Sequence, residues 1–116
     1  MANILGSTAW VAELIPGLES RIEQFVVDTD EVDDELVEVF VEEIRRLTAD
    51  LQEGLAKSDR EMVRMAAHSI KGMGGTLGLP EISVLGLEIE NLAKDDRLPD
   101  AQPLVDALAK WMESLG

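Results

Sequence analysis

Apolar residues of the 116-residue chain recur at spacings of three and four positions instead of alternating with polar ones. This spacing is the period of an α-helix, whereas a half-buried strand has a period of two. The clearest stretch begins at Asp34, where an apolar face runs beside a charged face rich in Glu and Arg. The members of this apolar face are Val37, Phe40, Val41, Ile44, Leu47, Leu51 and Leu55. The pattern predicts a long amphipathic helix from Asp34 and an all-α fold.

Capping residues and prolines mark where the next helices begin. Ser58 and Glu61 have the spacing of a capping box, which predicts a helix that starts near Asp59 and stops around residues 77–78. Pro80 can open the helix that follows, because proline fits a first helical turn. The first of these two helices contains the one histidine of the chain.

The two ends of the chain also carry helical signals. A short helix is expected over residues 8–14, and Pro16 is expected to open a second segment that runs to about Val27. Pro99 and Pro103 are expected to bracket the start of the last helix. The apolar stripes of the last two long helices are Ile82, Leu85, Ile89 and Leu92, and then Leu104, Leu108, Trp111, Met112 and Leu115. Long amphipathic helices joined by short turns bury such stripes most simply as an antiparallel four-helix bundle.

Charge and composition narrow the class of partner. Asp and Glu number 24 against 10 Lys and Arg, and the net charge of -14 repels nucleic acids and anionic lipid headgroups. The chain has no cysteine, which excludes disulfides, thiolate catalysis and cysteine metal sites. No apolar run approaches the roughly 18 to 20 residues needed to span a bilayer, and no signal peptide is evident. We therefore expect a cytoplasmic protein that binds other proteins or a small ligand. A monomer is the expected oligomeric state, although the sequence itself leaves that state open.

His68 stands apart from the apolar face of its helix. That face is formed by Val63, Ala66, Ala67, Ile70, Met73 and Leu77. His68 lies roughly 160° from the centre of the face, so its imidazole is expected to project into solvent opposite the packing side. A neutral imidazole is a good nucleophile, and it titrates near pH ~6.5 in model peptides. His68 is therefore a candidate nucleophile, and a surface histidine without a role is the alternative.

Two glycines, Gly72 and Gly75, share the face of His68. A glycine inside an exposed helix costs about 1 kcal/mol relative to alanine, so these residues call for an explanation. Bare backbone beside the imidazole would let the active site of another protein approach closely. The alternative is that Gly74, Gly75 or Gly78 ends the helix, which does not account for Gly72 in mid-pattern.

Arg64 and Lys71 lie on the same face, four residues before and three residues after His68. In an otherwise acidic protein they would place positive charge beside a phosphoryl group that reaches the imidazole. An ordinary solvated helix face is the alternative for both. The residues expected to contact a partner around His68 are Arg64, Met65, Gly72 and Gly75.

The motif AHSIKG at residues 67–72 resembles the signature of histidine phosphotransfer (HPt) domains, which relay phosphoryl groups in multistep two-component signalling. Its continuation comprises Gly75, Leu77, Gly78, Ile89 and Glu90. The resemblance extends over about residues 34–115, with Ile70 where leucine is commoner. It implies an antiparallel four-helix bundle with an additional N-terminal helix. We therefore expect an N-terminal helical segment over residues 1–30, packed on an HPt bundle over residues 31–116.

The resemblance also implies roles and partners. The motif histidine carries the phosphoryl group in that family, which assigns this role to His68, and the following lysine and glycine correspond to Lys71 and Gly72. The implied partners are response-regulator receiver domains and a hybrid sensor histidine kinase. His68 is expected to accept a phosphoryl group from a receiver phosphoaspartate and to pass it to another receiver. Because the receiver holds the Mg²⁺, the chain is expected to need no metal or cofactor of its own.

Other function classes stay open on sequence alone. The chain could be a non-catalytic helical adaptor, or the excised HPt domain of a hybrid or chemotaxis-type kinase. The GMGG run at residues 72–75 lacks the strand and the Lys-Ser/Thr of a phosphate-binding loop. We therefore expect a phosphocarrier without ATP-dependent kinase activity. A single histidine with scattered carboxylates gives no compact ligand set, which argues against a metalloenzyme.

Overall fold

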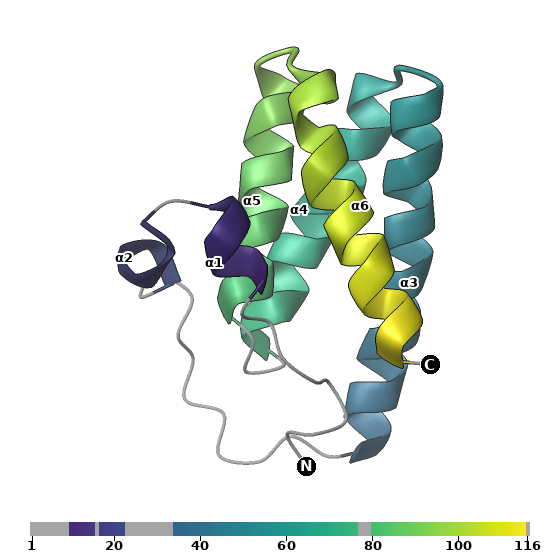
Figure 1. The fold of residues 1–116 in the computed structure, drawn as a ribbon. Coiled ribbons are helices and arrows are strands. Elements are labelled where there is room, and N and C mark those ends of the chain that lie inside the picture. The colour runs from purple at the N-terminus through teal and green to yellow at the C-terminus, as the bar shows by residue number, and fades with distance from the viewer. Residues whose placement is uncertain (1–9, 16, 23–33, 77–79, 116) are drawn as a thin grey trace.

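The computed structural model describes residues 10–15, 17–22, 34–76 and 80–115. These residues form helices and no strand, as the apolar spacing predicts. The helices are α1 (Trp10–Leu14), α2 (Leu18–Ile22), α3 (Asp34–Ala56), α4 (Arg60–Thr76), α5 (Pro80–Lys94) and α6 (Leu98–Leu115). The four long helices, α3 to α6, stand side by side and alternate in direction (Figure 1). The predicted all-α bundle is therefore confirmed.

The core lies where the apolar stripes of the long helices meet. Helix α4 packs against α3 and α5, and α6 closes the bundle against the same two helices. Buried side chains on the predicted stripes are Ile44, Leu47, Leu51, Val63, Ala66, Ala67, Ile70, Ile82, Leu85, Ile89, Leu92, Leu104, Leu108, Trp111 and Met112. Each large apolar side chain buried in this way stabilises the fold by about 1.5 to 3 kcal/mol.

Some predicted stripe residues lie at the edge of this core. The partly buried ones are Phe40, Val41, Leu55 and Met73. The side chains of Val37, Leu77 and Leu115 lie outside the described part of the structure. The periodicity thus identifies the core faces correctly wherever it can be checked.

The turn between α3 and α4 differs from the capping-box prediction. Ser58 adopts a left-handed backbone conformation with φ 54°. Its amide donates to the carbonyl of Leu55 at 3.2 Å. The next amide, of Asp59, donates to the carbonyl of Gly54 at 2.8 Å, which completes the Schellman arrangement that ends a helix. The N-cap of α4 is Asp59, because its Oδ1 accepts the Met62 amide at 3.2 Å. The capping-box assignment of Ser58 is therefore wrong.

The turn between α5 and α6 repeats this geometry. Asp96 has φ 59°, and the amide of Arg97 donates to the carbonyl of Leu92 at 2.8 Å. Helix α6 then starts at Leu98 and contains Pro103 in its interior. Proline lacks the amide that a helix interior uses, so α6 forgoes one backbone hydrogen bond there. The prediction that Pro99 and Pro103 bracket the helix start is therefore wrong, because both prolines lie inside α6.

The segment before the bundle packs on one of its sides. Helices α1 and α2 lie against α5 (Figure 1). The indole of Trp10 tilts against that of Trp111 with ring centroids 6.0 Å apart. Arg21 Nη2 reaches Glu88 Oε2 of α5 at 3.0 Å. This pair is partly solvated, so it contributes about 0 to 1 kcal/mol. The described residues here form two short helices, while a single additional N-terminal helix and the boundary at residue 30 stay predictions.

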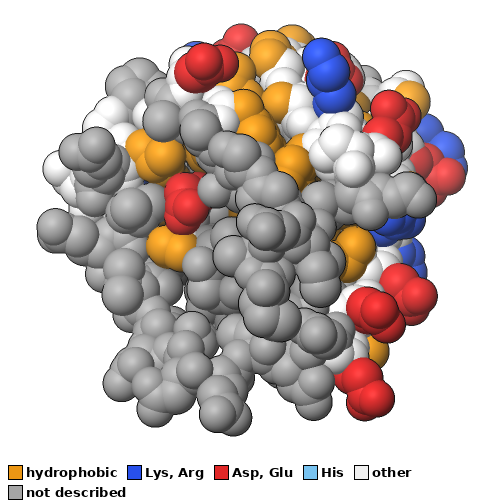
Figure 2. All heavy atoms as spheres, turned by 60° about the horizontal axis from the view of Figure 1, so that its bottom comes forward, with side chains coloured by type: hydrophobic (Ala, Val, Ile, Leu, Met, Phe, Trp, Pro, Cys, Tyr) orange, Lys and Arg blue, Asp and Glu red, His pale blue; other side chains and the backbone are white. Residues whose placement is uncertain are grey.

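The surface reflects the acidic composition. Figure 2 views the end of the bundle that lies at the bottom of Figure 1, and its described right-hand edge shows acidic side chains interspersed with a few Lys and Arg. None of the described helices is long and apolar enough to cross a membrane.

Candidate functional site

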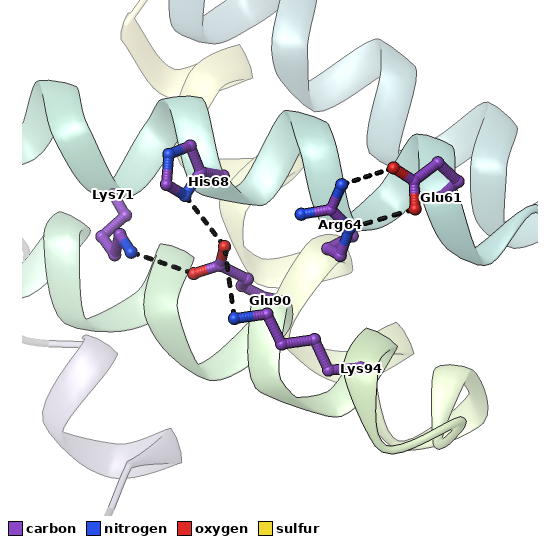
Figure 3. A network of polar contacts seen from close by, with 6 residues as sticks. All are labelled: Glu61, Arg64, His68, Lys71, Glu90 and Lys94. Carbon is purple, nitrogen blue, oxygen red and sulfur yellow. Dashed lines mark hydrogen bonds and ion pairs between the residues drawn. The ribbon is translucent and has the colours of Figure 1, made fainter.

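The imidazole of His68 is exposed, but it is not isolated from the rest of the bundle. Its side chain is 62% accessible, as expected for a residue off the apolar face of α4. Yet Nδ1 lies 2.9 Å from Oε2 of Glu90 on α5 (Figure 3). The prediction that His68 points away from the packing side is therefore wrong in one respect. The ring stands at the edge between α4 and α5, where it is open to solvent and anchored to the neighbouring helix.

Glu90 is the buried centre of this site. Its side chain is only 2% accessible, and its other oxygen, Oε1, accepts a hydrogen bond from Lys71 Nζ at 3.1 Å. Lys94, one turn further along α5, places its Nζ 3.9 Å from Oε2. Burial raises the pKa of Glu90, but the hydrogen bonds from Lys71 and His68 outweigh it, so the pKa lies below its ordinary value. Glu90 is therefore an ionised carboxylate surrounded by cationic and hydrogen-bond-donating groups.

The charge of Glu90 determines the tautomer of the imidazole. An ionised carboxylate can only accept hydrogen bonds, so Nδ1 of His68 must carry the proton that it shares with Glu90. The lone pair of a neutral ring then resides on Nε2. Figure 3 shows the second ring nitrogen directed away from Glu90. In this arrangement Nε2 is a nucleophilic nitrogen that faces outward, and the hydrogen bond from Nδ1 to Glu90 fixes the orientation of the ring.

A family model described as Hpt domain matches residues 35–116 of the chain. The chain belongs to the Hpt domain family. Hpt domains carry out histidine phosphotransfer in phosphorelays, where they interact with receiver domains and kinases. Searches of curated proteins and of solved structures return no significant match. Family membership thus indicates histidine phosphotransfer as the general activity. Which atoms of this chain take part must be inferred from the geometry around His68.

Lys71 and Lys94 flank the imidazole from two helices. The Lys71 side chain is 26% accessible and the Lys94 side chain 51%, and both ammonium groups are directed toward Glu90 (Figure 3). Within the residues that the structure describes, no group of three His, Asp or Glu side chains could hold a metal ion. Lys71 and Lys94 bring positive charge to the carboxylate that holds His68.

Arg64 lies on the predicted face but is held by a neighbour. Its Nε donates to Glu61 Oε2 at 3.0 Å, and its Nη2 contacts the other oxygen of the same carboxylate. Both residues belong to α4, so this is a local pair one turn apart. The guanidinium that was expected beside the phosphoryl group is paired with Glu61 on the same helix (Figure 3). The hydrogen bond to Glu61 raises the pKa of Arg64, and the charge of Glu90 also raises it.

The remaining predicted contact residues lie on α4 around His68. Met65 is one of the exposed large apolar side chains, at 58% accessibility. Gly72 is exposed in mid-helix, and a Cβ atom added there would meet nothing within 4 Å. Gly75 belongs to α4, but its surroundings lie outside the described part of the structure. Neither Gly74 nor Gly75 ends the helix, because α4 continues to Thr76, and Gly78 lies outside the described residues.

From the sequence, Glu90 is recognised only as part of a motif, and Lys94 is not predicted to belong to the site. A signal for Glu90 is present, because this carboxylate falls among the buried positions Ile89, Leu92 and Ala93 of α5. A charged group at such a position is expected to have a partner. The partner itself could not be identified, because it lies on another helix, 22 positions earlier in the chain.

Proposed function

We propose that this Hpt domain accepts a phosphoryl group on Nε2 of His68 from the phosphoaspartate of a receiver domain and passes it to a second receiver. The contact between Nδ1 of His68 and the buried carboxylate of Glu90, at 2.9 Å, is the observation that carries the proposal. An idle surface histidine needs no such anchor. A phosphoryl carrier does, because its reactive nitrogen must face a partner in a defined direction.

The transfer needs no proton to move. The lone pair of Nε2 attacks the phosphorus atom, the P–O bond of the acyl phosphate breaks, and the receiver carboxylate leaves with the bonding electrons. The imidazole then has a substituent on Nε2 and keeps its hydrogen on Nδ1, so it is positively charged. Glu90, whose carboxylate is already ionised, stabilises that charge directly. Attack by the carboxylate of a second receiver reverses these steps.

The two lysines supply charge for the phosphoryl oxygens. Lys71 lies one helical turn after His68, and Lys94 approaches Glu90 from α5. Ammonium groups near a dianionic phosphoryl group form charge-assisted hydrogen bonds, which favour the phosphorylated ring over the neutral one. In this proposal Lys71 stabilises the phosphoryl group more than Lys94 does, because Lys71 is less exposed and its charge is less screened by water.

The receiver is proposed to dock on the α4 face around His68. Gly72 leaves open space there, Met65 offers an exposed apolar side chain, and Arg64 and Gly75 complete the expected contact surface. The Mg²⁺ ion would accompany the receiver, and the Hpt domain would need no cofactor of its own. The cytoplasmic location, the monomeric state and a hybrid kinase as the upstream partner stay predictions.

The direct test is phosphoryl transfer from a radiolabelled, phosphorylated receiver domain to this protein. We expect the label to move to the Hpt domain, to be acid-labile as a phosphoramidate bond is, and to be absent from His68→Gln. A second donor, the small molecule phosphoramidate, separates reactivity from docking, because it needs no protein contact. If His68→Gln accepts label at the rate of the parent protein, the assignment of His68 is wrong. Binding of a receiver without any transfer would instead support the adaptor alternative.

A further inference from the structure

Helices α4 and α5 approach each other closely at a glycine of α5, Gly86. A Cβ atom added to Gly86 would lie 2.7 Å from the backbone nitrogen of Lys71, 2.9 Å from the carbonyl oxygen of Ala67 and 3.0 Å from Cα of Lys71. All three neighbours are backbone atoms, so no side-chain rotation can relieve the overlap. Any side chain at position 86 would have to push the two helices apart.

A hydrogen bond holds the same two helices together one turn earlier in α5. Ser83 Oγ donates to the backbone carbonyl of Lys71 at 2.7 Å. Ser83, Gly86 and Glu90 follow one another at spacings of three and four residues, which places them on one face of α5. We call Ser83 and Gly86, with the backbone of Ala67 and Lys71 that they contact, the α4–α5 seam. Glu90 emerges from this seam one turn beyond Gly86.

We infer that Gly86 is a positioning residue for phosphoryl transfer. The missing side chain sets the α4–α5 separation that allows Glu90 to reach Nδ1 of His68 and Nζ of Lys71 together. Through Glu90 it fixes the imidazole tautomer and the outward direction of Nε2. The consequence for transfer rests on the proposed function of His68, whereas the consequence for the tautomer does not.

Because Glu90 makes hydrogen bonds with both of its oxygens, these contacts are sensitive to the distance between α4 and α5. Oε2 contacts His68 at 2.9 Å and Oε1 contacts Lys71 at 3.1 Å, both within ordinary hydrogen-bond length. If α5 moved away from α4, the carboxylate could follow one partner only by turning from the other. A shift of a few tenths of an ångström at Gly86 is therefore expected to weaken at least one of the contacts.

The test compares two tightly packed helical glycines. Gly86→Ala strains the α4–α5 seam. Gly54→Ala is the matched control, because a Cβ there would meet Val63 Cγ2 at 2.7 Å, between α3 and α4 and away from Glu90. Three quantities are measured for each folded variant: the melting temperature, the ¹⁵N chemical shifts of the His68 ring, which report the tautomer, and the rate of transfer from a phosphorylated receiver.

We expect both substitutions to lower the melting temperature, but only Gly86→Ala to move His68 from the Nδ1–H tautomer toward a mixture. Transfer by Gly86→Ala should slow by about tenfold, because misplacement of a reacting group by a fraction of an ångström has effects of this order. In a Glu90→Gln background, Gly86→Ala should cause no further loss, since Gly86 acts through Glu90. Such non-additivity is not expected of a residue that only supports the fold.

Three results would overturn the inference. One is an unchanged tautomer and rate in a destabilised Gly86→Ala, which would make Gly86 a packing residue only. Another is an equal tautomer shift in Gly54→Ala, which would indicate general loosening. The third applies if Gly86→Ala does not fold. Ser83→Ala then tests the same seam, because it removes the hydrogen bond to Lys71. If His68 in Ser83→Ala has the same tautomer as in the parent protein, the inference is contradicted. If the parent accepts no phosphate at all, the proposed function fails while the tautomer measurement still decides the role of Gly86.

Discussion

Two ion-pair clusters in this protein are opposite in charge and in setting. At Glu90 one carboxylate lies among His68, Lys71 and Lys94, whereas at Arg46 one guanidinium lies between two carboxylates. The Glu90 side chain is 2% accessible and connects two helices, while the Arg46 side chain is 60% accessible and its partners belong to its own helix, α3.

The difference shows which charge pairs can control geometry. Arg46 contacts Glu43 and Asp50 at spacings of three and four residues on a solvated surface. Such pairs add little stability and allow the side chains to exchange partners with water. Glu90 has no comparable freedom, because its carboxylate is buried and both of its oxygens are engaged across a helix interface. Only the Glu90 cluster can therefore orient a reacting group.

The largest contrast is expected on removal of the central charge of each cluster. Glu90→Gln keeps the shape of the side chain but cannot stabilise a positively charged imidazole, so transfer should slow by about 10- to 100-fold. Arg46→Gln, as the control, should leave the rate within about twofold. Rates from single-turnover transfer with a labelled receiver decide this comparison. Equal rates for Glu90→Gln and the parent protein would show that the buried cluster has no part in the chemistry.

A charge added beside the Glu90 cluster should have the next largest effect. Gly72→Glu places a carboxylate in open space on the α4 face, where it would obstruct a receiver and repel the phosphoryl group, so we expect about a tenfold loss of transfer with helicity retained. Gly72→Ala should instead stabilise the fold by roughly 0.5 to 1 kcal/mol through better helical propensity. Thermal melts and transfer rates on both variants test the access hypothesis. Fast transfer by Gly72→Glu would refute it, and unfolding of Gly72→Ala would indicate a conformational need for glycine.

Removal of one cation from the Glu90 cluster should have a milder effect. Lys71→Ala is expected to slow transfer severalfold and to shorten the lifetime of the phosphohistidine, because about one charge-assisted hydrogen bond to the phosphoryl oxygens is lost. Lys57→Ala is a suitable control, since Lys57 is an exposed lysine paired with Glu53 on α3 at 3.7 Å. Decay of the isolated phosphoprotein gives the lifetime directly. If the two lysine variants decay alike, Lys71 is an ordinary surface residue.

The sequence specifies the bundle well, because helical periodicity is local. The stripe that includes Ile44 and Leu51, and its counterparts on the other long helices, needs no knowledge of the neighbours. The errors fall where two adjacent residues compete for one role. Ser58 and Asp59 can both cap a helix, and only the backbone conformation shows that Ser58 ends α3 while Asp59 begins α4. Pro103 is a different case, since packing of α6 outweighs one lost hydrogen bond.

The residues of the candidate site also divide into those predictable from local sequence and those whose role depends on contacts between helices. His68, Lys71 and Gly72 lie within one short motif and could be named from the sequence, whereas the role of Glu90 depends on a contact between helices. Gly86 is harder still to recognise. In the sequence it is an unfavourable residue in mid-helix, and only the 2.7 Å approach to the Lys71 backbone gives it a function. Residues that act through tertiary distance leave no local pattern.

The smallest expected effect is on stability at acid pH, where the Glu90 and Arg46 clusters should again differ. Hydrogen bonds from Lys71 and His68 outweigh burial and lower the pKa of Glu90, and a hydrogen bond from Arg46 lowers the pKa of Glu43. A carboxyl whose pKa is lower in the folded state stabilises the protein above its unfolded pKa, about 4.3 for glutamate, and this contribution is lost as the pH falls through the folded value. The parent protein should therefore lose more stability than Glu90→Gln on acidification from about pH 5, as urea unfolding would show. Glu43→Gln should change this slope less, because the exposed Arg46 cluster is well solvated. Parallel curves for the parent and Glu90→Gln would mean that Glu90 has no net linkage to folding.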